Sequence, residues 1–183
     1  MRLGLSRGAV RLCLVACLAL GTFASKNSNA NDLFSFGQKD QSALVTGGVG
    51  SIGNIWSDRD SAGVFSIQYR TSKTFEFLRI RPVLGLLATT DESVYAWFGL
   101  STDMTFFERI VLTLDAGVGG YDKGNGQTLG HDVNFRTGGT VAWRFNNNAR
   151  LGVGFHHLSN AGLDAINPGT ESLSLYYSHP LNF

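Results

Sequence analysis

Hydrophobic and polar residues alternate with a period of two along most of the chain after its first 30 residues. This alternation is typical of strands with one apolar and one polar face. A helix that crosses a membrane needs about 18 or more consecutive apolar residues, and no such run occurs in this part of the sequence. The pattern therefore excludes helical membrane spans and predicts an all-β protein. It is clearest in segments 65–70, 78–86, 110–119, 133–145, 150–156 and 172–183.

Segments near 44–53 and 92–102 also resemble strands, although the sequence does not assign their faces. Together these segments supply eight predicted strands, each near the roughly 9–11 residues that a tilted transmembrane strand needs. An even number of strands closes naturally into a barrel with both ends on the periplasmic side. We therefore predict an eight-stranded antiparallel transmembrane β-barrel, in which odd strands run outward and even strands return.

The residue composition of the polar face indicates which of two kinds of barrel the chain forms. A soluble barrel of the lipocalin type points its apolar face inward around a ligand, whereas a membrane barrel points it outward to lipid. A face rich in arginine and glycine suits a narrow, hydrogen-bonded lumen, with Asp115 and Asp132 as the visible partners of the arginines. The arginines predicted to point inward are Arg70, Arg79, Arg81, Arg136, Arg144 and Arg150.

Aromatic residues near the predicted strand ends are expected at the two membrane interfaces, as in other membrane barrels. The terminal Phe183 also resembles the sorting signal of bacterial outer-membrane barrels. The residues predicted for the interfacial belts are Tyr69, Trp97, Trp143, Phe145 and Phe155.

Residues 1–30 have the layout of a secretory signal peptide, with a basic start, an apolar stretch and small residues that suit cleavage after Ala24 or Ala30. A lipoprotein cleavage box before Cys17 is a weaker alternative, because apolar residues continue beyond it. Residues 31–183 then form the barrel, with the hairpin 150–183 as its active-site hairpin. Both cysteines lie within residues 1–30, so the mature chain is predicted to hold no disulfide and no cysteine nucleophile.

Residues 31–183 carry 11 basic and 14 acidic groups, a net charge near −3, which argues against nucleic-acid binding. Two short motifs are also set aside. Residues 48–53 match GxGxxG, but no amphipathic helix follows as nucleotide binding requires. His156 and His157 are neighbours on a predicted strand and point to opposite faces, so they cannot chelate one metal ion.

The segment after residue 150 carries the candidate chemistry. His157 and Ser159 are two residues apart on a predicted strand, so their side chains share a face and can form a hydrogen bond. The hairpin returns so that Glu171 can lie beside His157, which completes a serine, histidine and acid arrangement. Continuing the alternation places all three on the lipid-facing side, where polar residues are costly. The alternative is that the strand ends near residue 156 and that these are solvated loop residues.

This hairpin resembles the signature of the lipid A 3-O-deacylases, the PagL family of Gram-negative outer membranes. The resemblance implies that Ser159 is the nucleophile, His157 the general base and Glu171 the residue that orients the histidine. It places Asn160 near the oxyanion, with the backbone N–H groups of Ala161 and Gly162 as further candidate donors and Asn167 as a positioning residue. The matching residues are Phe155, His157, Ser159, Asn160, Ala161, Asn167, Pro168, Gly169 and Glu171.

The resemblance implies an outer-membrane esterase that removes the 3-O-linked acyl chain of lipid A in lipopolysaccharide and releases a 3-hydroxy fatty acid. It implies a site towards the outer leaflet and a reaction without a metal or an organic cofactor, and it leaves a homodimer open. A non-enzymatic adhesin or structural barrel is one alternative, although the predicted loops are short. An outer-membrane phospholipase or a lipid A acyltransferase is another, but neither a calcium-binding acidic set nor a donor-lipid site is visible in the sequence.

Overall fold

The computed structural model describes residues 33–37, 42–53, 61–75 and 79–181. The predicted signal peptide, its cleavage sites and Phe183 lie outside the described residues. No helix within the described ranges is long and apolar enough to cross a membrane. The strands are β1 (Phe34–Phe36), β2 (Ala43–Gly53), β3 (Ala62–Arg70), β4 (Arg81–Thr89), β5 (Val94–Phe106), β6 (Ile110–Asp122), β7 (Val133–Arg144), β8 (Arg150–Ser159) and β9 (Thr170–Leu181).

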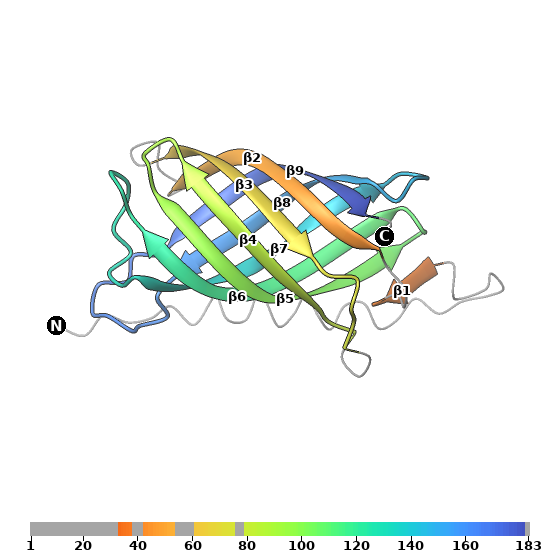
Figure 1. Ribbon diagram of the computed structural model, residues 1–183, viewed down its shortest axis with the longest axis horizontal. Coiled ribbons are helices and arrows are strands. Elements are labelled where there is room, and N and C mark those ends of the chain that lie inside the picture. Colours follow the sequence, from red (N-terminus) through yellow and green to blue (C-terminus); the bar gives the residue numbers. More distant parts are fainter. Residues whose placement is uncertain (1–32, 38–41, 54–60, 76–78, 182–183) are drawn as a thin grey trace. The chain divides into compact units, whose positions relative to one another are not determined.

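The long strands β2 to β9 close into an antiparallel barrel (Figure 1). Each pairs with its neighbours in the chain, and β2 also pairs with β9, with Ala43 opposite Leu181 and Gly53 opposite Glu171. The predicted all-β, eight-stranded antiparallel barrel is therefore confirmed. The short β1 was not expected, and it pairs with the end of β5 that extends beyond β4.

The outer wall of this barrel is apolar and the interior is polar. Phe98 is 68% exposed and Phe65 is 59% exposed, whereas Gln68 and Arg136 are buried. A barrel with this arrangement is stable only when hydrocarbon covers its outer wall, which is the pattern of membrane barrels and the reverse of the lipocalin type. The predicted faces of the clearly alternating strands are thus confirmed.

Two residues differ from the predicted faces. Trp97 does not lie in an interfacial belt: it is 4% exposed and points inward, with the guanidinium carbon of Arg136 at 4.7 Å from its ring centroid. Its neighbours Ala96 and Phe98 take the outward positions of β5. Arg79 does not belong to the inward face either, because it precedes β4 with a positive φ of 52° and donates to the carbonyl of Gly37 at 2.7 Å.

Asp103 is the acid that the sequence did not identify in the lumen. It accepts a hydrogen bond from Arg70 at 2.9 Å through one carboxylate oxygen and from Arg150 at 2.8 Å through the other. Thr113 also donates to it, at 2.7 Å. Ion pairs thus join β5 to β3 and β8 through the interior.

The second interior carboxylate is Asp115, as predicted. It pairs with Arg136, and its other oxygen lies 3.0 Å from Nε2 of His156. Asp132, the other predicted partner of the arginines, instead lies exposed in the connection before β7. That prediction was wrong because residue 132 lies beyond the strand, outside the lumen.

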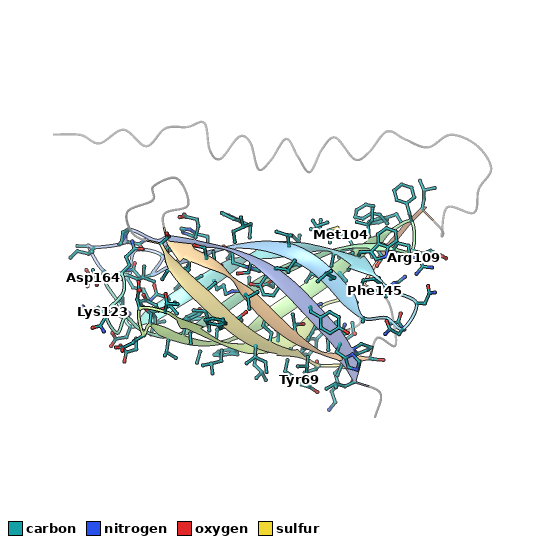
Figure 2. All side chains as sticks on the ribbon, turned by 90° about the horizontal axis from the view of Figure 1, so that it is seen from above. Tyr69, Met104, Arg109, Lys123, Phe145 and Asp164 are labelled. Carbon is teal, nitrogen blue, oxygen red and sulfur yellow. The ribbon has the colours of Figure 1, made fainter. Side chains whose placement is uncertain are left out.

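The two ends of the barrel differ in the connections they carry. At one end, residues 71–80, 107–109 and 145–149 join β3 to β4, β5 to β6 and β7 to β8. At the other end, residues 90–93, 123–132 and 160–169 join β4 to β5, β6 to β7 and β8 to β9. Figure 2 shows Lys123 and Asp164 at one end and Tyr69, Arg109 and Phe145 at the other. At the end that carries residues 123–132 and 160–169, Leu129 is buried in one apolar cluster with Tyr95, Trp97 and Leu158. This end carries the candidate site.

Candidate active site

Strand β8 continues through the candidate residues instead of ending near residue 156. Its outward positions are Leu151, Val153, Phe155, His157 and Ser159 in turn, and its ladder with β7 extends to the pair of Ser159 and Phe135. His157 and Ser159 therefore emerge on the outer wall, with Cα atoms about 6–7 Å apart along the strand. The alternative of solvated loop residues does not fit this geometry.

Glu171 completes the arrangement from the neighbouring strand. It lies directly opposite His157 in the register of β8 and β9. Nδ1 of His157 is 3.1 Å from Oε1 of Glu171, and the side chains are 43% and 26% exposed. A carboxylate that holds Nδ1 leaves Nε2 as the proton-accepting nitrogen of the neutral ring. The structure thus brings His157, Glu171 and Ser159 together on one face.

Gly169 packs against the edge of the His157 ring formed by Cε1 and Nε2. A Cβ built on Gly169 would lie 2.7 Å from Cε1 and 3.3 Å from Nε2 of His157, and the residue has a φ of +67°. Gln127, from the connection before β7, donates to the carbonyl of Gly169 at 3.2 Å. The ring is therefore confined between Glu171 and a backbone segment that has no room for a side chain.

Sequence reasoning assigned no role to Gly169 or Gln127. The sequence Asn167-Pro168-Gly169 is a turn signal that favours a positive φ at the glycine, so the turn could have been predicted. The contact with His157 could not, since it depends on how the hairpin closes. For Gln127 the sequence holds no signal.

The side-chain amide of Asn160 is engaged by the loops and not by the candidate trio of Ser159, His157 and Glu171. Asn160 is 0% exposed, and its Nδ2 donates to the carbonyls of Leu129 and Ile166, both at 2.8 Å. Both amide hydrogens are thus engaged, and the expected oxyanion donor is a loop anchor in this structure. The physical reason is that Asn160 follows Ser159 in the chain and so lies on the opposite face of the strand.

The other expected positioning residues belong to the same loop scaffold. Gly162 donates its backbone N–H to Oδ1 of Asn160 at 2.8 Å, and Asn167 accepts the backbone N–H of Asn160 at 3.0 Å. Ala161 has a φ of +54°, and within the described part of the chain its N–H has no acceptor. Of the three expected oxyanion donors, only the Ala161 N–H is not already engaged.

The remaining sequence candidates lie elsewhere. The glycine-rich segment 48–53 is part of β2 and precedes no described helix. His156 points into the lumen towards Asp115, on the face opposite to His157. Among the described residues, no three His, Cys, Asp or Glu side chains are grouped so that they could hold a metal ion.

The fold and the site together define a class: membrane-spanning β-barrels that carry a serine, a histidine and a carboxylate on their outer wall. The family model described as lipid A 3-O-deacylase (PagL) matches residues 33–180. The chain therefore belongs to the PagL family of lipid A 3-O-deacylases, and it is a hydrolase of the outer membrane. A comparison with curated proteins gives no significant match.

Solved structures agree with this assignment. The crystal structure of the outer membrane enzyme PagL is 26% identical, covers 75% of this chain and 99% of its own, and superposes with a TM-score of 0.58. A de novo designed transmembrane β-barrel (14% identical, 79% of this chain and 98% of its own, TM-score 0.53) shares the fold. So does Neisserial surface protein A, NspA (11% identical, 81% of this chain and 99% of its own, TM-score 0.50).

Proposed function

We propose that this chain hydrolyses the 3-O-linked acyl ester of lipid A with Ser159 as nucleophile, His157 as general base and Glu171 as the group that orients the histidine. The observation that carries the proposal is the hydrogen-bonded pair of His157 and Glu171 on the apolar outer wall, with Ser159 two positions along the same strand face. Polar groups of such complementary chemistry are costly on a wall that faces lipid, and a substrate in the membrane would account for them.

In the proposed reaction, Nε2 of His157 takes the proton of the Ser159 hydroxyl as Oγ attacks the ester carbonyl. The tetrahedral intermediate collapses to an acyl-enzyme when His157 returns the proton to the leaving sugar oxygen. Water, deprotonated by the same imidazole, then releases the 3-hydroxy fatty acid and regenerates Ser159. Glu171 holds the tautomer in which Nδ1 carries the hydrogen and stabilises the imidazolium that forms.

The developing oxyanion needs a preorganised donor. The N–H of Ala161 is our candidate, because the N–H of Gly162 and the amide of Asn160 are already engaged within the loop. The positive φ of Ala161 keeps this N–H out of the strand ladder. A single well-placed donor contributes about 3 kcal/mol to such a transition state.

We further propose that the end of the barrel that carries residues 123–132 and 160–169 faces the outer leaflet. Strand β2 begins and β9 ends at the opposite end, where Ala43 lies opposite Leu181. In bacterial membrane barrels the short turns are periplasmic, and two of the three connections at that end, residues 107–109 and 145–149, are short. This orientation would put the trio at the depth of lipopolysaccharide esters.

The test is mass spectrometry of lipid A from cells that express the wild type or Ser159→Ala. We expect loss of one 3-hydroxyacyl group only with the wild type, while both proteins run as folded, heat-modifiable barrels on gels. Release of an acyl group by folded Ser159→Ala would refute the nucleophile. Unchanged lipid A with the folded wild type, together with cleaved phospholipids, would favour the phospholipase instead.

A further inference from the structure

A recess lies on the outer wall near the candidate site and is not used by the proposed chemistry. It has a volume of about 680 Å³ and lies between the start of β5, the end of β6 and the connection before β7. Its floor is formed by Val94, Ala96 and Gly120, which are outward positions of their strands. Figure 2 shows Lys123, at its edge, and Asp164, in the loop after Ser159, at the same end of the barrel.

Two small residues create this recess. Ala96 and Gly120 lie directly opposite each other in the ladder of β5 and β6. A Cβ on Gly120 would meet no atom within 4 Å, so the space above the glycine is open. The neighbouring outward positions carry the large side chains of Phe98 and Phe135. The wall is thus hollowed at one place in an otherwise bulky apolar surface.

The connection that covers the recess is fixed to the active-site loop. Its Leu129 carbonyl accepts a hydrogen bond from Asn160 at 2.8 Å. At Gly130 a Cβ would lie 1.8 Å from the carbonyl oxygen of Ile166, so the two loops touch backbone to backbone. The recess is therefore formed in advance and is held in a set position relative to Ser159.

We propose that this recess receives a second acyl chain of the same lipid molecule whose ester lies at Ser159; the proposal rests on the proposed function. The floor is continuous with the apolar wall that faces hydrocarbon. Only β7 separates β6 from β8, so Gly120 in the floor of the recess lies about 10 Å around the barrel from Ser159. That spacing is within the width of a lipid that carries several acyl chains side by side.

The edge of the recess fits the boundary between acyl chains and a polar head. Thr128, His131 and Lys123 line it, together with Asp122 and Asp132. Nδ1 of His131 accepts the N–H of Val133 at 2.9 Å, so Nε2 is the nitrogen left for a ligand. A sugar presents hydroxyl and amide groups that suit such a mixed set of donors and acceptors.

A seated second chain would align the ester with Ser159. Binding energy from a part of the substrate remote from the reacting bond can be used to position that bond. The recess would therefore distinguish lipids with several acyl chains from esters with a single chain. This is a selectivity that the trio by itself cannot supply.

Filling the recess tests the proposal. In Gly120→Phe, and separately in Ala96→Leu, we expect the ratio of kcat/KM for purified lipid A to kcat/KM for p-nitrophenyl butyrate to fall about tenfold or more. The matched control is Gly47→Phe. Gly47 is also an outward glycine with no atom within 4 Å of its Cβ, but it lies opposite Tyr177 on the wall formed by β2 and β9. The control should keep the wild-type ratio.

A binding measurement separates this proposal from the proposed function. In the Ser159→Ala background, Gly120→Phe should weaken binding of lipid A in detergent micelles about tenfold, whether or not the wild type hydrolyses it. An unchanged ratio and unchanged binding in folded Gly120→Phe and Ala96→Leu would overturn the recess as a subsite. Absence of hydrolysis by the wild type, with binding still sensitive to Gly120→Phe, would overturn only the proposed function.

Discussion

His157 is held from two sides, and each contact has a separate consequence for the proposed reaction. Glu171 fixes Nδ1 through a contact of 3.1 Å, and the backbone of Gly169 lies against the Cε1 and Nε2 edge of the ring, with no room for a side chain. An imidazole on a strand can otherwise rotate about χ1 and χ2. Confinement by both neighbours limits this rotation and leaves Nε2 as the ring nitrogen available to Ser159 in the proposed reaction.

Gly169→Ala should therefore lower activity without removing any reacting group. The new methyl group would displace the His157 ring, and a misplacement of about 1 Å can reduce kcat up to about a hundredfold. We expect kcat for lipid A to fall about ten- to a hundredfold with little change in KM. The control is Gly162→Ala, where φ is +84° but a Cβ meets no atom within 4 Å, so it adds backbone strain alone. Equal losses in both variants would contradict the positioning role.

Glu171→Gln tests the orienting carboxylate. Glutamine preserves the side-chain shape but cannot stabilise an imidazolium, and its amide can hold the wrong tautomer of His157. We expect kcat to fall by on the order of 10²–10⁴, less than in Ser159→Ala, with an unchanged heat-modifiable barrel. A wild-type kcat in single-turnover measurements would contradict this role.

At the scale of elements, the loop of the β8–β9 hairpin is anchored to its surroundings by a buried side chain. Buried Asn160 joins the end of β8 to the carbonyls of Leu129 and Ile166. One side chain thus connects this hairpin to the loop before β7. Asn160 therefore holds in place both the loop with the proposed oxyanion donor, Ala161, and the residues 123–132 that cover the recess.

Asn160→Ala should loosen both loops while the barrel persists. The substitution leaves the carbonyls of Leu129 and Ile166 and the Gly162 N–H without the partner that Asn160 supplies. Each of these groups that water cannot reach costs about 1–3 kcal/mol. We expect faster hydrogen exchange and faster proteolysis in residues 123–132 and 160–169. Asn147→Ala is the matched control, because Asn147 accepts one hydrogen bond, from the Ala149 N–H, in an exposed turn at the other end. Identical exchange in wild type and Asn160→Ala would contradict the anchor.

At the scale of the whole molecule, charged groups in the lumen join strands that are far apart in the chain. Asp103 bonds Arg70 and Arg150, which belong to β3 and β8. The carboxylate is nearly inaccessible, with 2% of its side chain exposed. These pairs cross the interior, so they hold together strands that are not neighbours in the sheet.

Asp103→Ala should therefore destabilise the entire barrel. It leaves buried guanidinium groups without their carboxylate, a change that costs about 3–5 kcal/mol in other proteins. We expect a lower temperature for the gel shift between folded and unfolded forms. Asp132→Ala, which removes an exposed carboxylate, should leave that temperature unchanged. An unchanged transition in Asp103→Ala would show that the interior pairs contribute little.

Much of this architecture follows from local patterns in the sequence. The period-two alternation predicts the strands, and the polar composition of one face predicts which side is inward, because side chains on a strand alternate between faces. The same rule places His157 and Ser159 on the outer wall and identifies the strand pair that brings Glu171 beside them. The only contact between strands that these inferences need is the one within a single hairpin.

Only the tertiary structure shows which side chains of different strands and loops contact one another. The pattern of residues 92–102 is apolar on both faces, so it did not predict that Trp97 points inward, and the expectation of Asp132 as an arginine partner was wrong. Asp103 meets Arg150, 47 positions away, only because the strands close in one register. Asn160 was expected at the oxyanion and instead joins two loops, and the recess at Ala96 and Gly120 exists only where a loop covers two small side chains. Local alternation sets which face a residue takes, whereas its contacts depend on register and closure, which are properties of the whole sheet.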